Sequence, residues 1–370
     1  MVKIDDSFTQ AILKEQDRYE GKYIDDNIVA ALPKGARIDL VRTIGATHWS
    51  ILTKLDTTID SRRQSFFLKE YRDANAEHMV KAEYESTAAL YAAVPNHVPQ
   101  PYAYGCFASD SQRFFYLQSF CDMEDAPVYA DKATAASMKP FVEEFVGVLA
   151  EVHSNESPTG KFGFHIDTFQ GNVVNHNRWC DTWEEYFSRN LRYLIKLERS
   201  IHGGDPEMDA LSAGIMTKVV PRLLRPMESG GNKIKPVLLH GDMWHGNVSV
   251  DKKTRSPMLY DAGCLFGHHE YEAAPWRAAR YAFNKTHLNA YLEIVPASKP
   301  QEDYDDRNEL YAVRNNLVVS CCWKQNKTTR QSAIEGMRSL VTKFPDGYEG
   351  YVAANQANGK RDSRKLNAKL

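Results

Sequence analysis

The sequence lacks several features that would assign it to a class at once. Its net charge of −2 over 370 residues provides no field that would recruit nucleic acid. No apolar run reaches membrane-spanning length, the N-terminal stretch is too often charged for a secretory signal, and there is no internal repeat or low-complexity segment. The six cysteines show no C-x-x-C pairing, which fits reduced, buried thiols. We therefore expect a soluble, intracellular protein, long enough for two lobes with a core in each.

The most informative stretch is V-L-L-H-G-D-M-W-H-G-N-V-S-V, residues 237–250. It reads as a buried strand, a polar turn and a second short strand. Within the turn, Asp242 precedes Asn247 by five positions. This D-x-x-x-x-N spacing is typical of kinase catalytic loops, in which the Asp accepts the proton of the substrate hydroxyl and the Asn holds magnesium. Asp and Asn are also ordinary turn residues, but the flanking L-L-H-G and the interleaved Trp244 and Gly246 favour the kinase interpretation.

A further carboxylate follows a second apolar strand, Met258 to Tyr260, which delivers Asp261. Magnesium prefers oxygen ligands in near-octahedral geometry. We therefore expect the amide of Asn247 and the carboxylate of Asp261 to bind Mg²⁺, with the phosphates of ATP completing the shell. Asp242 is then the expected catalytic base.

The N-terminal half predicts an antiparallel sheet and one helix, because polar and apolar residues alternate between polar turns. The expected strands are residues 37–44, 49–55, 65–71, 101–107 and 113–120. Lys69 lies inside an apolar run of the third strand, and the helical stretch that follows it carries Glu83. A strand lysine that contacts the α- and β-phosphates and pairs with a helix glutamate recurs in kinases. We predict a Lys69–Glu83 pair, with Glu85 as the alternative partner.

Glycine is scarce where a phosphate-binding loop is expected. Between the first two strands the sequence is T-I-G-A-T-H-W-S, with a single Gly45. Ala46 and Thr47 could still offer backbone N–H groups to phosphate, and Thr47 a hydroxyl. Adenine is expected to meet the backbone of a hinge after the fifth strand, at Ser119, Phe120 and Cys121.

The C-terminal half is predominantly helical in its periodicity. The expected helices fall in residues 132–153, 183–194, 208–224, 271–282, 306–323 and 333–344. The whole predicts an α+β, two-lobed architecture with the nucleotide between the lobes. The expected units are a nucleotide-binding lobe with an extra helical segment at its start, a helical catalytic lobe and a flexible basic tail, at 1–121 (extra segment 1–35), 122–354 and 355–370.

Two histidine-containing segments leave alternatives open. In K-F-G-F-H-I-D-T-F-Q-G-N-V, a structured loop at 161–173, His165 and Asp167 either bind a ligand or support the loop. In G-H-H-E-Y-E, residues 267–272, two His and two Glu suggest zinc, but the H-x-x-x-H spacing is absent. We expect this second segment to order the loop that carries Asp261.

Together these motifs resemble those of the fructosamine/ketosamine-3-kinases, in the aminoglycoside-phosphotransferase-like branch of the protein-kinase-like fold. L-L-H-G-D-M-W-H-G-N is similar to the family's L-L-H-G-D-L-W-x-G-N, and K-F-G-F-H, W-C-D-T-W-E-E-Y-F and D-A-G-C-L-F-G-H-H-E-Y-E also have counterparts. The likeness covers roughly residues 36–345.

The resemblance implies ATP and Mg²⁺ as cofactors, and it implies the roles given above for Asp242, Asn247, Asp261, Lys69 and Glu83. It also implies phosphorylation of the sugar 3-hydroxyl of ketosamines, on small amines or protein lysines, in a deglycation reaction. The residues expected near the substrate are Trp244, His245, His268 and Glu270.

This chain departs from the family pattern at three places. The phosphate loop lacks the extra glycines and the loop cysteine, His245 replaces a small residue, and Ala262–Gly263 replaces Pro-Ala. A kinase-like phosphotransferase for another small hydroxyl metabolite and a nucleotide-binding pseudokinase scaffold are the alternatives. The intact set of Lys69, Asp242, Asn247 and Asp261 argues against the scaffold.

The sequence ends in Ala368-Lys369-Leu370, a variant of the S-K-L peroxisomal address. We expect either import through a peroxisomal receptor or a cytoplasmic location.

Overall fold

The computed structural model describes residues 24–47, 49–71, 74–127 and 132–367, with side chains left out at 132–137 and from 358 onward. The first part of the expected N-terminal helical segment and the C-terminal tripeptide lie outside these residues. Within them, no helix is both long enough and apolar enough to cross a membrane.

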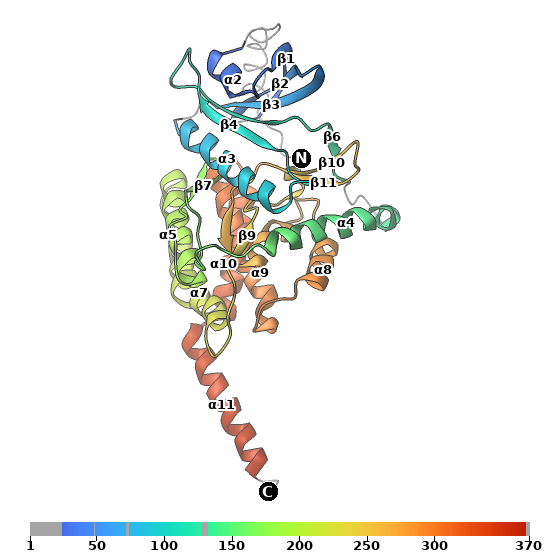
Figure 1. Ribbon diagram of the computed structural model, residues 1–370. Coiled ribbons are helices and arrows are strands. Elements are labelled where there is room, and N and C mark those ends of the chain that lie inside the picture. The colour runs from blue at the N-terminus through green and yellow to red at the C-terminus, as the bar shows by residue number, and fades with distance from the viewer. Residues whose placement is uncertain (1–23, 48, 72–73, 128–131, 368–370) are drawn as a thin grey trace.

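The N-terminal lobe is one antiparallel sheet with a short helix before its first strand and a long helix that follows its third strand in the sequence and lies beside the sheet (Figure 1). Its strand order is β1-β2-β3-β5-β4. The elements are α2 (Asp26–Ala31), β1 (Arg37–Ala46), β2 (Ser50–Ile59), β3 (Arg62–Tyr71), α3 (Ala76–Ala93), β4 (Pro101–Cys106) and β5 (Phe114–Ser119). The five expected strands and the helix between the third and fourth are confirmed.

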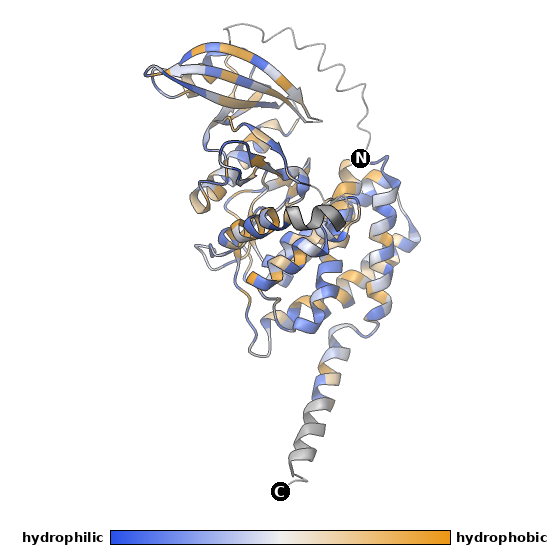
Figure 2. Ribbon diagram, turned by 90° about the vertical axis from the view of Figure 1, so that its right-hand side faces the viewer, coloured by the Kyte–Doolittle hydropathy of each residue, from blue (hydrophilic) through white to orange (hydrophobic). Residues whose placement is uncertain are grey.

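Side chains alternate along β2, so that one face of the sheet contributes to a buried core there (Figure 2). Leu55, Phe66 and Leu117 are fully buried and pack with Ile28 of α2 in a single core. This rigid sheet holds β3, and therefore Lys69, in a fixed register between β2 and β5.

The C-terminal lobe is mostly helical and begins where β6 (Met123–Asp125) leaves the N-terminal sheet and pairs with β10. Its helices are α4 (Lys132–His153), α5 (Trp183–His202), α6 (Pro206–Gly214), α7 (Val220–Leu224), α8 (Lys285–Ile294), α9 (Tyr304–Cys322), α10 (Lys327–Lys343) and α11 (Gly347–Asn367). A π-helix (Ile215–Val219) joins α6 to α7, and 3-10 helices occupy Arg225–Glu228, His245–Asn247, His269–Arg277 and Gln301–Asp303. The α+β class is confirmed.

Three small sheets lie among these helices and carry the polar loops. Their strands are β7 (Thr168–Gln170) with β8 (Val173–Asn175), β9 (Val237–Leu239) with β12 (Leu265–Gly267), and β10 (Val248–Asp251) between β6 and β11 (Pro257–Leu259). A large buried cluster around Trp183 and Tyr311 packs α5, α7, α9 and α10 against β9 and β12. The loops that follow β9 and β11 therefore start from the core of the lobe.

Two segments differ from expectation. Residues 269–277 form a 3-10 helix with Pro275 inside it, followed by bends, where a helix over 271–282 is expected, since proline removes a backbone donor. Residues 355–367 continue α11 instead of forming an irregular tail, and α11 projects away from the rest of the molecule (Figures 1 and 2). Its first turns are held by aromatic contacts, with Arg222 over the Tyr351 ring at 4.4 Å.

Candidate active site

The loop after β9 makes a tight turn that only glycine permits at position 241 and that is closely packed at Gly246. Gly241 has φ +84°, and a Cβ there would lie 2.1 Å from the carbonyl oxygen of Gly263. A Cβ at Gly246 would lie 2.4 Å from the ring of Trp244. The turn thus brings the loop against the segment after β11, which carries Asp261.

Within this turn Asp242 and Asn247 contact each other, as their spacing predicts. Asn247 Nδ2 donates to the carbonyl oxygen of Asp242 at 2.8 Å and to its carboxylate at 3.2 Å. Burial raises the pKa of the Asp242 carboxyl to about 7, and Asp261 adds to this increase, while hydrogen bonds from Gln170 and Asn247 oppose it. A carboxylate with this pKa is well suited to accept a proton near neutral pH.

Asp261 adopts a left-handed backbone conformation directly after β11, with φ +63°. That conformation is uncommon for a residue with a Cβ and is a feature of strained functional loops. Its Oδ1 accepts a hydrogen bond from Lys69 Nζ. Although the Asp261 side chain is 49 % exposed, desolvation by the surrounding protein acts to raise its pKa, and the Lys69 ammonium outweighs this effect and holds the pKa below its ordinary value.

Lys69 is buried and bridges two carboxylates. Its Nζ lies 2.8 Å from Glu83 Oε1 of α3 and also pairs with Asp261 of the other lobe. Burial would lower the pKa of Lys69, but these two carboxylates hold it well above its ordinary value. Tyr71 donates to the second oxygen of Glu83 at 2.6 Å, which fixes the Glu83 side chain. Glu85, the alternative partner, instead contacts His165 at 3.0 Å.

The donors around Asn247 and Asp261 fit a magnesium ion. Among the described residues, the hydrogen bonds of the Asn247 side chain all use its amide nitrogen, which leaves the amide oxygen for a ligand. Asp261 supplies a carboxylate whose side chain is 49 % exposed. An amide oxygen and a carboxylate are the hard oxygen ligands that Mg²⁺ selects, with room for phosphate oxygens and water.

The loop between β1 and β2 uses its polar groups internally. The Thr47 hydroxyl accepts hydrogen bonds from the backbone N–H groups of Trp49 and Ser50, and the Thr47 amide donates to the Ser50 carbonyl at 2.8 Å. In this conformation these groups brace the turn, and the contact of Thr47 with phosphate stays a prediction that requires these hydrogen bonds to be exchanged. Ala46 is the last residue of β1.

Two backbone amides of the hinge after β5 also donate hydrogen bonds within the protein. The amide of Ser119 donates to the Gln100 carbonyl at 2.8 Å, and that of Phe120 to the Ser65 carbonyl at 3.0 Å. These two amides are therefore not free for adenine. The Cys121 amide stays the candidate in this segment.

Trp244 and His245 lie next to Asp242 in the same loop and are half-buried. The Trp244 ring centroid is 5.4 Å from that of Tyr281, and His245 Nδ1 accepts from the Ala282 amide at 3.2 Å. Both residues remain candidates for the substrate side of the site.

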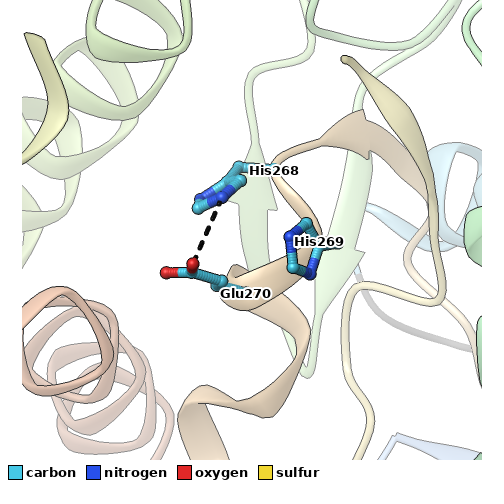
Figure 3. A group of neighbouring side chains, drawn as sticks. All are labelled: His268, His269 and Glu270. Atoms are coloured by element: carbon cyan, nitrogen blue, oxygen red, sulfur yellow. Dashed lines mark ion pairs between the residues drawn. The ribbon is translucent and has the colours of Figure 1, made fainter. Parts of the chain in front are cut away.

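His268 and Glu270 lie in the interior of the lobe and not on an accessible surface, contrary to the expectation that they border the substrate. They are 0 % and 1 % exposed, and the carboxylate of Glu270 is held by the guanidinium of Arg307 at 2.7 and 2.8 Å. With His269 they bring three possible ligand atoms within 4.8 Å of one another (Figure 3).

This trio is a hydrogen-bonded support of the interior. Both ring nitrogens of His268 have protein partners, the hydroxyls of Tyr311 and Ser298, each at 2.9 Å. His269 contacts the Tyr291 hydroxyl at 3.1 Å, and burial lowers its pKa to about 3. The Arg307 cation beside Glu270 further disfavours a metal ion here.

Two residues that hold the Asp242 loop are not indicated by the sequence motifs. Glu272, in the segment expected to order the Asp261 loop, instead accepts from the backbone amides of His240 at 2.6 Å and Gly241 at 3.0 Å, and so holds the Asp242 loop. Gln170 Nε2 donates to Asp242 Oδ1 at 2.8 Å. The only sequence feature that points to Gln170 is its place in the K-F-G-F-H segment, in which His165 and Asp167 are the more obvious candidates for ligand binding. In the structure His165 contacts Glu85, and Asp167 accepts across the hairpin from the amide of residue 177.

Comparison with known proteins identifies relatives over most of the chain. The family described as Fructosamine kinase matches residues 50–340. A chloroplastic protein-ribulosamine 3-kinase from Arabidopsis thaliana is 28 % identical over 255 residues, which cover 68 % of this chain and 69 % of the relative. Ketosamine-3-kinase from Mus musculus is 31 % identical over 160 residues, covering 42 % of this chain and 47 % of the relative.

Solved structures share the fold. A candidate fructosamine-3-kinase from Thermobifida fusca superposes with a TM-score of 0.65 at 18 % identity, covering 86 % of this chain and 100 % of the other. The aminoglycoside phosphotransferase APH(4)-Ia gives a TM-score of 0.56 at 14 % identity, covering 92 % and 99 %. The kinase-like two-lobed fold is confirmed by these likenesses.

Proposed function

The chain belongs to the fructosamine kinase family and is a phosphotransferase, and we propose that it transfers the γ-phosphoryl group of ATP to the sugar 3-hydroxyl of a ketosamine. The substrate would be a ribulosamine or fructosamine adduct on a small amine or on a protein lysine. Because a 3-phosphate makes such an adduct labile, the reaction would serve deglycation.

The observation that carries this proposal is the convergence of one cation and three acidic side chains from separate segments. Lys69 from β3 contacts Glu83 from α3 and Asp261 from the loop after β11. Asp242 lies beside Asn247, whose amide nitrogen also approaches the Asp261 carbonyl at 3.4 Å. The set matches the parts that phosphoryl transfer needs, namely phosphate positioning, metal ligation and an acceptor base.

Each side chain has a definite task in the proposed reaction. Asp242 orients the acceptor hydroxyl and takes its proton as the phosphoryl group is transferred. Lys69 binds the α- and β-phosphates when ATP enters, and Glu83 keeps its ammonium in place. Asn247 and Asp261 would hold Mg²⁺, which neutralises charge on the phosphates when bound.

The ATP part of the proposal is supported by the structural neighbours as well as by the residues. APH(4)-Ia has been crystallised in a ternary complex with AMP-PNP and hygromycin B. In this chain the hinge amide of Cys121 is the proposed adenine contact, since the two preceding amides are used within the sheet.

The acceptor part is supported by the relatives' names and by the surroundings of Asp242. The plant and mouse relatives are called ribulosamine and ketosamine 3-kinases. Beside Asp242, the aromatic pair Trp244 and Tyr281 offers an apolar surface on which a sugar ring can pack. His245 stands next to this pair and is the residue by which this chain would select among sugars.

The test is an acceptor panel with purified protein, ATP and Mg²⁺. We expect ADP release with ribulosyl-lysine or fructosyl-lysine but not with lysine alone. Phosphorus NMR should place the new phosphate on C3, and free lysine should then appear. Phosphorylation of unrelated alcohols only would disprove the ketosamine assignment, and absence of transfer to every acceptor would favour the scaffold alternative.

A further inference from the structure

Gln170 ends β7 and lies directly behind the catalytic loop, where three side chains meet it. Its Nε2 donates to Asp242 Oδ1 at 2.8 Å and to Asn315 Oδ1 at 2.9 Å. Its Oε1 accepts from Nη1 of Arg314. The Gln170 residue is only 6 % exposed, so water cannot easily replace these partners.

We propose that Gln170 and Arg314 are positioning residues for the proposed phosphoryl transfer. Arg314 fixes the direction of the Gln170 amide, and Gln170 in turn holds the Asp242 carboxylate in the orientation that accepts the proton. This inference rests on the proposed function and adds two residues to it.

The direction of the amide follows from the chemistry of its neighbours. A guanidinium can only donate hydrogen bonds, and an ionised carboxylate can only accept them. Gln170 therefore satisfies both Arg314 and Asp242 in one orientation alone, with its oxygen toward the guanidinium. If the amide were reversed, its oxygen would face the carboxylate and its NH₂ group would face the cation.

Arg314 is well placed for this task because no carboxylate of the described residues competes with Gln170 for its guanidinium. It is 5 % exposed, and within the described part of the chain its guanidinium takes part in no ion pair. Its contacts are Gln170, the amide oxygen of Asn175 and the ring of Tyr271 at 5.4 Å. Buried arginines are normally paired with a carboxylate. The carboxylate that Arg314 reaches, through the Gln170 amide, is Asp242.

Helix α9 supplies a rigid support for this relay. Arg314 and Asn315 are neighbours in the buried middle of α9, and Cys322 near its end packs against the β7–β8 turn. Gly171 in that turn has φ +59°, and a Cβ there would lie 2.8 Å from the Cys322 sulfur. The hairpin therefore lies closely against α9, and Gln170 is fixed relative to the helix.

Packing alone does not hold the Gln170 amide. A small cavity borders it, and its lining includes Gln170, Gly241, Arg314 and Asn315. The oxygen and the NH₂ group of an amide are nearly equal in size, so packing does not distinguish the two orientations and hydrogen bonds must do so. The Arg314 contact is therefore the element that selects the amide direction.

The decisive variant is Gln170→Met, compared with Gln170→Glu. Glutamate keeps the bond to Arg314 and gains an ion pair, but it has no donor for Asp242. An ionised glutamate would also repel the Asp242 carboxylate, so Gln170→Met, which is neutral, is the variant for which a purely structural role predicts retained activity. The positioning role predicts a fall in kcat of about 100-fold for either variant, since small misplacements of a reacting group have effects of this size. The KM for ATP should stay within about two-fold, because the nucleotide contacts are not touched.

The arginine is tested by a double-mutant cycle. Arg314→Leu should lower kcat by about ten-fold, and Arg314→Lys, which keeps one donor, should recover part of this loss. In the Gln170→Met background, Arg314→Leu should have almost no further effect on kcat, because it acts through Gln170. Effects that multiply in the double variant would overturn the relay.

A matched control separates folding from positioning. Arg330→Leu removes a half-buried arginine of α10 that pairs with Glu198 outside the relay. It should lower the melting temperature and leave kcat unchanged. Melting curves of all variants identify any loss that comes from unfolding.

Crystal structures of the parent and of Gln170→Met give a readout that needs no acceptor. The inference predicts that the Asp242 carboxylate turns away from its parent orientation in the variant, and an unchanged orientation would overturn it. A parent protein without transfer to any acceptor would instead count against the proposed function. Activity of Gln170→Met within about two-fold of the parent would also overturn the positioning role.

Discussion

At the scale of single residues, Lys69 shows how a polar group in an apolar strand acquires a defined place. Its ammonium would be costly to bury alone, and the carboxylates of Glu83 and Asp261 compensate for this cost. The choice between Glu83 and Glu85 follows from the helix, because residues two positions apart face different directions. Glu83 faces β3, whereas Glu85 faces the loop that carries His165.

This difference gives a prediction with an internal control. Glu83→Gln removes a carboxylate that anchors Lys69, so we expect kcat/KM for ATP to fall by about ten-fold or more. Glu85→Gln, on the same helix, breaks only an exposed contact with His165 and should change kcat/KM by less than about two-fold. Steady-state kinetics at saturating acceptor measure both. Equal effects of the two changes would contradict the assignment of Glu83.

Short-range spacing made some of these residues predictable. Asp242 and Asn247 share one turn, and Lys69 and Glu83 lie in consecutive elements of the chain. Gln170 reaches Asp242 across 72 positions and Arg314 across 144, and no local pattern marks such contacts. The prediction that His268 and Glu270 lie near the substrate fails for a related reason. Sequence composition does not tell whether a polar pair faces a ligand or a buried arginine.

At the scale of elements, periodicity predicted the sheet and most helices but not the positions at which helices break. Alternation in β2 and helical spacing in α5 were sufficient because these elements bury mainly one face, whereas β5 and α9 are buried on nearly all sides. Pro275 turns the expected helix at 271–282 into a 3-10 segment, and α8 then begins at Lys285. The start of α8 depends on a capping box between Asn284 and His287.

His287 makes the stability of α8 depend on pH. It is 1 % exposed, and burial lowers its pKa from 6.5 to about 4. Below pH 6.5 the unfolded chain takes up a proton at this residue, whereas the folded chain does not until about pH 4. The contribution is therefore fully present above pH 6.5 and decreases as pH falls, by about 3 kcal/mol in all, since each pH unit is worth about 1.4 kcal/mol.

His287→Gln tests this, because glutamine can still accept the Asn284 amide in the capping box. Loss of ring contacts with Phe283 should lower the stability of the variant at pH 7. Between pH 6.5 and 4, the unfolding free energy of the variant should fall less steeply than that of the parent, by up to about 1.4 kcal/mol per pH unit. Urea titrations at several pH values measure the slope. His78→Gln, at an exposed position of α3, is the control, and equal slopes for parent and His287→Gln would refute the assignment.

At the scale of the whole molecule, the proposed centre takes residues from both lobes. Besides the Lys69–Asp261 pair, the lobes meet where Trp49 of the β1–β2 turn contacts Trp323 at the end of α9, with ring centroids 5.9 Å apart. The α+β class and two lobes were predictable from the change in period along the chain. The contact between the turn and α9 was not, because it joins segments at opposite ends of the sequence.

A ligand that contacts both lobes should stabilise the whole protein. Mg²⁺ and ATP together, at 100 times the dissociation constant, should add about 2.7 kcal/mol to the free energy of unfolding. Differential scanning fluorimetry should show the higher melting temperature with MgATP and a much smaller shift when EDTA is present. Asp261→Asn should lose most of the shift, because it weakens the carboxylate ligand. A full shift in EDTA would contradict the metal assignment.

The central claim, that Asp242 is the base of a phosphoryl-transfer centre, is tested most directly by the rate of ADP release with ribulosyl-lysine in the parent and in Asp242→Asn. Asparagine keeps the size of the side chain but cannot take up the hydroxyl proton. The account predicts a loss in kcat of about 10³-fold while the stabilisation by MgATP is retained. A variant that transfers phosphate within about ten-fold of the parent rate would contradict it.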